Sequence, residues 1–367
     1  MIKKVLVFGI TDLKGGVESV IMNYYRNIDR TKIQFDFLCN TEKVAYEDEI
    51  RSLGGRIFKI TARSKNPKKY KVELENIFKK NSKNYSAIWV NVCSLANIDY
   101  LKMAKKYNIK KRIIHSHNSK NMDSKIRGIL HRINRIFIKK YATDFWACSN
   151  DAAKWFFSKK IIKSNKYKMI NNAIDIEKYQ YNVMSRNQIR KELNADESTF
   201  IVGNIGRFHF QKNHPFIIKV FKEVHKKIKN SLLILIGEGE DIDKIKKMVK
   251  EENLQKNVLF LGTRDDIPRL LSGMDAFLFP SFFEGLSLTS VEATANGIDF
   301  YAKESCMPKF IIETKNFHAI DITNEIDVAN ELIKNKKNAR INNKETLNKN
   351  GLNIKIEAKK MQEYFEE

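Results

Sequence analysis

Short apolar segments alternate with longer charged amphipathic segments along most of the chain, and this alternation restricts the fold more than any other feature. Segments such as residues 87–91, 200–205 and 231–236 carry apolar side chains at consecutive positions rather than at every second one. Consecutive apolar residues are typical of strands that helices cover on both faces. Repetition of strand, helix and strand therefore predicts an α/β fold of doubly wound, parallel, Rossmann-like sheets.

The chain is long enough for two such sheets. It has 367 residues, and a domain typically has roughly 100–200. The polar segment 179–190 precedes a new strand at Phe200 and is interpreted as a linker. We therefore expect a first domain over residues 1–178 and a second over residues 179–349, followed by a final helix-like stretch.

The sequence favours a cytoplasmic protein without a structural metal site. No apolar run approaches the ~20 residues that span a bilayer. The four cysteines lie far apart and show no zinc-ligand spacing, as is typical of reduced thiols. No cluster of carboxylates is interpreted as a site for Mg²⁺ or Mn²⁺.

Basic residues are concentrated in the first half of the chain. Residues 1–180 contain 38 Lys and Arg against 16 Asp and Glu, whereas residues 181–367 contain 29 against 27. A positive face indicates an anionic partner, either nucleic acid or the inner leaflet of a membrane. No nucleic-acid-binding signature accompanies the charge. We therefore expect peripheral association with the inner membrane face, and no nucleic acid, although a basic nucleic-acid-binding protein stays an alternative.

Residues 124–142 are predicted to form a basic amphipathic helix. Apolar side chains recur there at three- and four-residue spacing, namely Ile126, Ile129, Leu130, Ile133, Ile136 and Phe137. Such a helix can lie on anionic lipid. We expect instead that the apolar stripe faces the domain core, which leaves only the Lys and Arg side chains for a membrane.

Candidate ligand-binding residues follow the strands, because ligands of doubly wound sheets bind at the carboxyl ends of strands. Arg207 and Lys212 follow the strand at 200–205, and two cations there could neutralise a diphosphate. Ordinary solvated surface charges are the alternative. Gly237-Glu-Gly239 forms another tight turn after the next strand, but it is no dinucleotide fingerprint.

The segment 279–297 combines two carboxylates with a helix start. Glu284 precedes Gly285 at the mouth of the predicted helix, and Glu292 lies about two turns along it. Backbone N–H groups of residues 285–288 suit an anion, and carboxylates suit hydroxyl groups. This combination predicts a site for a sugar that carries phosphate.

Two features of the first half point to the same kind of ligand. Gly15 and Gly16 form a strand-to-helix turn whose N–H groups can approach an anion. His117 follows the strand at 111–115, where we expect it to face a cleft, whereas His115 belongs to the strand. The two histidines are not interpreted as a metal-binding pair.

The order of these motifs resembles the family 4 glycosyltransferases of the GT-B fold, often encoded with capsule or exopolysaccharide genes. The motifs run from Gly-Gly through His-Ser-His-Asn, Gly-Arg…Lys-Asn and Gly-Glu-Gly to Phe-Pro-Ser-Phe-Phe-Glu-Gly-Leu…Glu-Ala, and cover about residues 1–330. The resemblance implies two Rossmann-like domains facing across a cleft. It also implies that a C-terminal helix, within residues 350–367, returns to the first domain.

The resemblance further implies a retaining, metal-independent transfer from a nucleotide sugar, with no cofactor. The donor is most commonly a UDP-sugar, held mainly by the second domain. The acceptor, held mainly by the first domain, is a polyprenyl-diphosphate-linked or other saccharide used in surface polysaccharide synthesis.

The site residues carried over from the resemblance would contact four parts of the donor. Arg207 and Lys212 would bind the donor diphosphate, and Glu292 would bind the ribose. Glu284 and the following backbone would hold the transferred sugar near C3 and C4, through Gly285, Leu286, Ser287 and Leu288. Gly16 would approach the phosphate, and His117 would contact the sugar. Backbone at Thr263 and Arg264 would meet the nucleobase.

Two other functional interpretations are compatible with the GT-B fold. Nucleotide-sugar 2-epimerases share the architecture, but their motifs differ from Glu-Gly-Leu…Glu-Ala. A non-catalytic subunit that stabilises a partner transferase would be expected to lose Arg207, Lys212 or Glu284, and all three are present.

Overall fold

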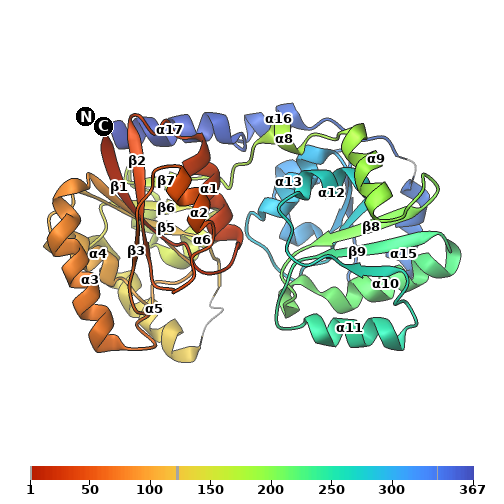
Figure 1. Cartoon of the computed structure of the whole chain (residues 1–367), viewed down its shortest axis with the longest axis horizontal. Coiled ribbons are helices and arrows are strands. Elements are labelled where there is room, and N and C mark those ends of the chain that lie inside the picture. Colours follow the sequence, from red (N-terminus) through yellow and green to blue (C-terminus); the bar gives the residue numbers. More distant parts are fainter. Residues whose placement is uncertain (1, 121–123, 337) are drawn as a thin grey trace. The chain divides into compact units, whose positions relative to one another are not determined.

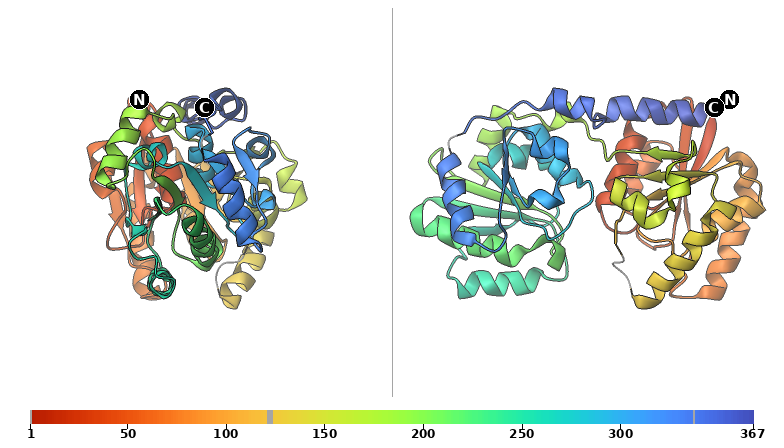
Figure 2. Two further views of the ribbon diagram at one scale, coloured as in Figure 1. Left: turned by 90° about the vertical axis from the view of Figure 1, so that its right-hand side faces the viewer. Right: turned by 180° about the vertical axis from the view of Figure 1, so that it is seen from behind.

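The computed structural model describes residues 2–120, 124–336 and 338–367, which form two compact α/β units (Figure 1). Unit 1 comprises Met1–Ala173 and Asn353–Glu367, and unit 2 comprises Ile174–Leu352. Each unit has one sheet whose strands all pair in parallel, with helices on both of its faces (Figures 1 and 2). The prediction of doubly wound parallel sheets is confirmed.

Seven strands form the sheet of unit 1 within the described residues. In spatial order they are β3 (Ile57–Lys59), β2 (Ile33–Cys39), β1 (Lys3–Phe8), β4 (Ala87–Val92), β5 (Lys111–Ser116), β6 (Asp144–Ala147) and β7 (Tyr167–Met169). The helices are α1 (Gly16–Asn27), α2 (Glu47–Ser52), α3 (Pro67–Asn81), α4 (Asp99–Lys106), α5 (Lys125–Phe137), α6 (Asn150–Phe156), α7 (Lys159–Ile162) and α17 (Ile354–Glu366), with short 3-10 turns η1 (Ser82–Asn84) and η2 (Ile138–Lys140).

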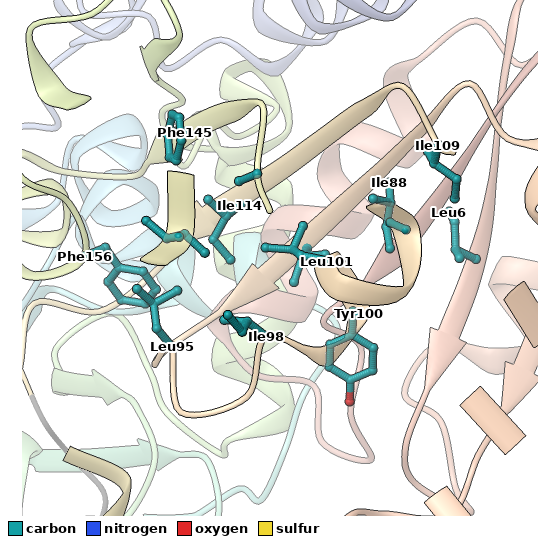
Figure 3. Close-up of a cluster of buried hydrophobic side chains, with 14 of the residues drawn as sticks. Leu6, Ile88, Leu95, Ile98, Tyr100, Leu101, Ile109, Ile114, Phe145 and Phe156 are labelled. Carbon is teal, nitrogen blue, oxygen red and sulfur yellow. The ribbon is translucent and has the colours of Figure 1, made fainter. Parts of the chain in front are cut away.

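One hydrophobic core of unit 1 lies between the sheet and the helices on one of its faces. Figure 3 shows Ile88 of β4 and Ile114 of β5 pointing toward Leu101 of α4, with Phe156 of α6 in the same layer. All four side chains are fully buried. Burial of a side chain of this size contributes about 1.5–3 kcal/mol, so this layer supplies much of the stability of unit 1.

The C-terminal helix α17 belongs to unit 1. The ring of Phe365 contacts the rings of Phe35 and Trp146 with centroids 5.9 and 6.0 Å apart. Tyr364 packs against Trp146 as well, and its carbonyl accepts a hydrogen bond from Lys111. The predicted return of the C-terminal helix to the first domain is therefore confirmed.

Six strands form the sheet of unit 2 within the described residues. In spatial order they are β10 (Val258–Phe260), β9 (Ser231–Ile236), β8 (Phe200–Ile205), β11 (Ala276–Phe279), β12 (Asp299–Ala302) and β13 (Phe317–Ala319). The helices are α8 (Ile176–Tyr179), α9 (Val183–Glu192), α10 (His214–Lys227), α11 (Ile242–Glu251), α12 (Ile267–Gly273), α13 (Leu288–Asn296), α14 (Lys309–Ile312), α15 (Glu325–Asn335) and α16 (Lys344–Lys349), with 3-10 turns η3 (Phe210–Lys212) and η4 (Glu304–Cys306).

The segment 179–190, interpreted from its polarity as a linker, is largely helical. Helix α9 starts at Val183, after Asn182 has capped it by accepting a hydrogen bond from the N–H of Ser185. Arg186 and Arg190 of this helix pair with Asp275 at 2.9 and 3.2 Å. The segment was interpreted as a linker because of polar residues such as these arginines, but the arginines bind it to unit 2. Unit 2 begins at Ile174.

The amphipathic helix predicted over 124–142 forms as α5 and η2, but its apolar stripe does not face the core. Ile126 and Ile136 are 71% and 75% exposed, whereas Gly128 and His131 are the buried residues of α5. The expected orientation of the stripe is therefore wrong. Figure 2 shows α5, coloured gold, at the periphery of unit 1.

Candidate active site

Two neighbouring strands of unit 2 deliver most of the predicted donor-binding residues to one edge of its sheet. β8 and β11 pair in parallel, with Val202 opposite Ala276. Their carboxyl ends therefore lie at the same edge, where the loop after β8 carries Arg207 and Lys212 and the loop after β11 carries Glu284.

Lys212 and Glu284 form a largely buried ion pair. Lys212 Nζ lies 2.7 Å from Glu284 Oε1, and the two side chains are 15% and 7% exposed. The ammonium group also lies 4.5 Å from the centroid of the Phe279 ring, within the range of a cation–π contact. These residues are 72 positions apart in the sequence, so the fold itself brings the two predicted groups together.

Hydrogen bonds to backbone carbonyl groups fix the two loops against each other. Gln211 Nε2 donates to the carbonyl of Phe283 at 2.8 Å, and the N–H of Phe282 donates to the carbonyl of Gln211 at 2.9 Å. The stem of Lys212 lies directly over Gly206, where an added Cβ would come within 3.3 Å of three of its carbons. The ammonium group is therefore held in place before any ligand binds.

Arg207 is more exposed than Lys212 and has a different partner. Its guanidinium donates to Glu240 Oε2 at 2.9 Å, and both side chains are more than half exposed. The Gly-Glu-Gly turn after β9 can pack closely against the loop after β8 that carries Arg207. Gly237 has φ +137°, and an added Cβ there would lie 2.2 Å from the carbonyl oxygen of Gly206. Only glycine fits that position.

Glu292 is buried on α13 and hydrogen-bonded. Its Oε1 accepts from Tyr179 Oη of α8 at 2.8 Å, and 9% of the residue is exposed. Burial raises the pKa of Glu292 to about 7, because desolvation disfavours the charged carboxylate more than the Tyr179 hydrogen bond and the nearby Lys178 favour it. A carboxyl group that titrates near neutral pH is characteristic of functional sites.

The residues between Glu284 and α13 form the start of that helix. Ser287 occupies the N-cap position in extended conformation and makes no side-chain cap. An added Cβ at Gly285 would meet no atom within 4 Å, and Leu286 is buried in a cluster with Val291 and Ile174. The first N–H groups of a helix have no acceptor within it, so this end of α13 favours an anion.

The segment Thr263–Arg264 follows β10, two strands from β8 in the sheet. The guanidinium of Arg264 makes a bidentate pair with Asp266, with both contacts at 2.7 Å. The side chain of Arg264 is therefore paired with Asp266, and the contact of this segment's backbone with a nucleobase stays a prediction.

In unit 1, the Gly-Gly turn lies beside a buried acid. Glu18 of α1 accepts a hydrogen bond from Thr11 Oγ1 at 2.5 Å, and burial raises its pKa. An added Cβ at Gly15 would lie 2.7 Å from Glu18 Oε2, whereas one at Gly16 would meet nothing within 4 Å. Gly15 is needed to accommodate Glu18, and Gly16 faces open space.

His117 is held by Asn91, the last but one residue of β4. Asn91 Oδ1 lies 2.9 Å from His117 Nε2 and 3.0 Å from His115 Nδ1, while Asn91 Nδ2 donates to the carbonyl of Phe8. Both histidines must therefore donate to the amide oxygen, which leaves His117 Nδ1 as an acceptor. Burial lowers the pKa of His117 to about 3, so the ring is neutral.

Sequence reasoning missed four partners of the predicted residues: Glu18, Asn91, Tyr179 and Glu240. Asn91 could have been found as a polar residue at the end of an apolar strand, and Glu240 as the acid after the turn at the end of β9. Tyr179 gave no signal, because it stood in the segment interpreted as a linker. Among the described residues, no group of three His, Cys, Asp or Glu side chains is arranged to hold a metal ion.

Sequence comparison finds relatives among glycosyltransferases. The sequence model of the family described as "Glycosyl transferases group 1" matches residues 185–353. The "Putative glycosyltransferase EpsF" of Bacillus subtilis is 30% identical over 303 residues, which cover 81% of this chain and 78% of the relative. An Escherichia coli protein, "UDP-Gal:alpha-D-GlcNAc-diphosphoundecaprenol alpha-1,3-galactosyltransferase", is 27% identical over 173 residues, covering 46% and 45% of the two chains.

Structure comparison gives the same fold. The crystal structure of Anabaena Alr3699/HepE in complex with UDP and glucose aligns with a TM-score of 0.75 at 16% identity, covering 99% of this chain and 95% of that one. The predicted GT-B fold is confirmed. At this level of identity the likeness concerns the fold alone.

Proposed function

Because the chain belongs to the group 1 glycosyltransferases, we propose that it is a retaining, metal-independent enzyme that uses a nucleotide-diphosphate sugar, with UDP as the preferred nucleotide. Unit 2 binds this donor, and unit 1 binds the acceptor. The acceptor is a lipid-linked or other saccharide in the synthesis of a bacterial surface polysaccharide. The names of the relatives support these assignments, since the galactosyltransferase is named for a UDP-Gal donor and a diphosphoundecaprenol-linked acceptor.

The observation that carries the proposal is the buried pair of Lys212 and Glu284 at the carboxyl ends of two adjacent strands. An ammonium group has three N–H donors, and Glu284 occupies one of them. Two remain for the oxygens of a diphosphate, in surroundings where partial burial strengthens the attraction. Glu284 has a second oxygen that can accept from hydroxyl groups of the transferred sugar.

Catalysis in this proposal is electrostatic. The bond between the sugar and the diphosphate breaks as the acceptor hydroxyl attacks from the same face, through an oxocarbenium-like transition state, and the hydroxyl proton passes to the departing phosphate oxygen. Negative charge develops on the departing nucleotide diphosphate, and Lys212, Arg207 and the N–H groups at the start of α13 stabilise it. Arg207 exchanges its exposed partner Glu240 for the diphosphate, at low cost because that ion pair is solvated.

The remaining groups orient the donor. Glu292 binds the ribose hydroxyls, and backbone at Thr263 and Arg264 meets the base. His117 contacts the transferred sugar from unit 1, and its neutral ring offers Nδ1 as an acceptor for a sugar hydroxyl. Gly16 lies in open space, and its backbone approaches the donor phosphate.

The enzyme associates peripherally with the inner face of the cell membrane, where a lipid-linked acceptor lies. The excess of basic residues in residues 1–180 supports this location. Within the described part of the chain, no helix combines the length and apolar character needed to cross a membrane.

A donor panel followed by turnover assays tests the proposal. UDP-sugars should raise the thermal midpoint more than GDP- or ADP-sugars, and turnover should persist in EDTA. Proton NMR of the product should show the anomeric configuration of the donor. Lys212→Ala should lower turnover by about 10²–10³-fold, the typical effect of losing one electrostatic stabiliser. Lys219→Ala, an exposed lysine of α10, is the matched control. Turnover of Lys212→Ala at the rate of the control would refute the assignment.

A further inference from the structure

Helix α5 presents its apolar side to solvent. Its six large apolar side chains are all exposed, from 38% for Leu130 to 75% for Ile136. They recur at three- and four-residue spacing, so they form one stripe along a single face of the helix. We call this face the α5 stripe: Ile126, Ile129, Leu130, Ile133, Ile136 and Phe137. No other helix of the described residues exposes as many large apolar side chains.

Polar side chains on the opposite face fasten α5 to unit 1. His131 Nδ1 accepts from the N–H of Leu95 at 3.0 Å, and Asn134 Nδ2 donates to the carbonyl of Leu95 at 2.6 Å. Arg135 donates to the carbonyl of Phe157 at 2.7 Å. The ring of His131 also stacks on Trp155, with centroids 4.2 Å apart. Rolling the helix to bury its stripe would break these contacts, so the exposed orientation is built into the fold.

Positive charge surrounds the stripe. No acidic residue occurs between Ser124 and Thr143. Lys102 and Lys105 of α4 lie within 6 Å of the Tyr141 ring centroid, just beyond η2. The cations on α5 and η2 that are themselves exposed are Lys125, Arg127, Arg132, Lys139 and Lys140. A complementary surface must therefore be both apolar and anionic.

We infer that α5 is a membrane-binding helix, whose stripe enters the acyl region at the surface of an anionic bilayer. The flanking cations then lie at the level of the lipid phosphates, as in other interfacial helices. Pairing of the stripe with a second copy of this chain would bring two sets of these cations together, which disfavours self-association. The inference rests on the proposed function, because a lipid-linked acceptor requires the enzyme at a membrane surface.

Vesicle flotation tests the inference on the full-length protein. The wild-type protein should float with vesicles of phosphatidylcholine and phosphatidylglycerol, and weakly with phosphatidylcholine alone. A triple variant, Ile129→Ser, Ile133→Ser and Ile136→Ser, should bind at least tenfold more weakly. It keeps every charge and alters only exposed side chains, so its thermal midpoint should match that of the wild type. The control replaces exposed apolar residues of unit 2, Val183→Ser and Met184→Ser, and should float like the wild type.

A charge variant tests the electrostatic contribution to membrane binding separately from the apolar one. Arg127→Gln with Arg132→Gln should lower affinity for the mixed vesicles by about fivefold for each charge removed. It should leave the weak binding to phosphatidylcholine unchanged.

Two outcomes would overturn the inference. One is equal flotation of the wild type and the triple variant. The other is a wild-type dimer, seen by sedimentation, that the triple variant dissociates while neither protein floats; the stripe would then be a subunit interface. Turnover with a water-soluble acceptor is measured in parallel. Normal turnover without flotation contradicts only the role of α5, whereas flotation without any nucleotide-sugar turnover contradicts the proposed function.

Discussion

Replacing Glu292 by Gln should stabilise the ligand-free protein at alkaline pH. The carboxyl group is buried, and its pKa rises from 4.5 to about 7 in the folded protein. Between these values the unfolded chain has released a proton that the folded chain still holds. The free energy of unfolding therefore falls as pH rises from 4.5 to 7, by about 3 kcal/mol at 1.36 kcal/mol for each pKa unit. Below pH 4.5 the carboxyl group is protonated in both states, so the free energy of unfolding no longer depends on its titration.

Gln has the same size and can still accept from Tyr179, but it cannot ionise. At pH 8 the Glu292→Gln variant should therefore be more stable than the wild type by about 3 kcal/mol, or ~6–12 °C in thermal midpoint. At pH 4.5 the two midpoints should coincide. Scanning calorimetry without ligand measures both. Glu345→Gln, at an exposed position of α16 in the same unit, should change neither.

The same variant should lose donor affinity. A hydrogen bond between a charged carboxylate and a hydroxyl is worth about 1.5–3 kcal/mol, so UDP should bind roughly 10–100-fold more weakly at pH 8. Isothermal titration measures this. A stability gain that is equal at both pH values would refute the raised pKa of Glu292. Unchanged UDP affinity would refute its proposed contact with the ribose.

Three further changes have defined outcomes. Lys212→Met leaves Glu284 buried without its partner, so the free energy of unfolding measured in urea should fall by about 3–5 kcal/mol. Adding Glu284→Gln should restore most of this stability but not turnover. Asn91→Ala removes the acceptor that orients His117, so the free energy of unfolding should fall by about 1–3 kcal/mol and kcat should fall more than KM rises; an unchanged kcat would contradict the positioning role. Tyr179→Phe removes a hydrogen bond that lowers the pKa of the Glu292 carboxyl group. The pH below which UDP binding is lost should therefore be higher than in the wild type, as titration from pH 6 to pH 9 would show.

The sequence was sufficient to predict the parallel sheets and the groups at their carboxyl ends. Lys212 and Glu284 could be placed together because each follows a buried strand, and parallel strands end at a common edge. Their direct contact could not be predicted, since it depends on the path of two loops. The same holds for Arg207, whose partner Glu240 comes from a third loop. No strand was predicted at β7 or β13, because each has a polar residue, Lys168 or His318, between its two less polar ones and so shows no apolar run.

The orientation of α5 shows a more general limit. Periodicity establishes which residues share a face of a helix, but it does not say which face the protein covers. For α5 the answer depends on Leu95 and Phe157, whose backbone groups bind the polar face from distant parts of the sequence. Burial of the apolar stripe was the expected arrangement, and specific polar contacts reversed it.

The position of α17 affects how the protein is made. Because Asn353–Glu367 follow unit 2 in the sequence but belong to unit 1, unit 2 is synthesised before the last helix of unit 1. Until then the aromatic surface that receives Phe365, around Phe35 and Trp146, has no cover. Unit 1 therefore completes its fold only after unit 2 has been synthesised, and a nascent chain stalled before residue 354 should depend on chaperones to stay in solution.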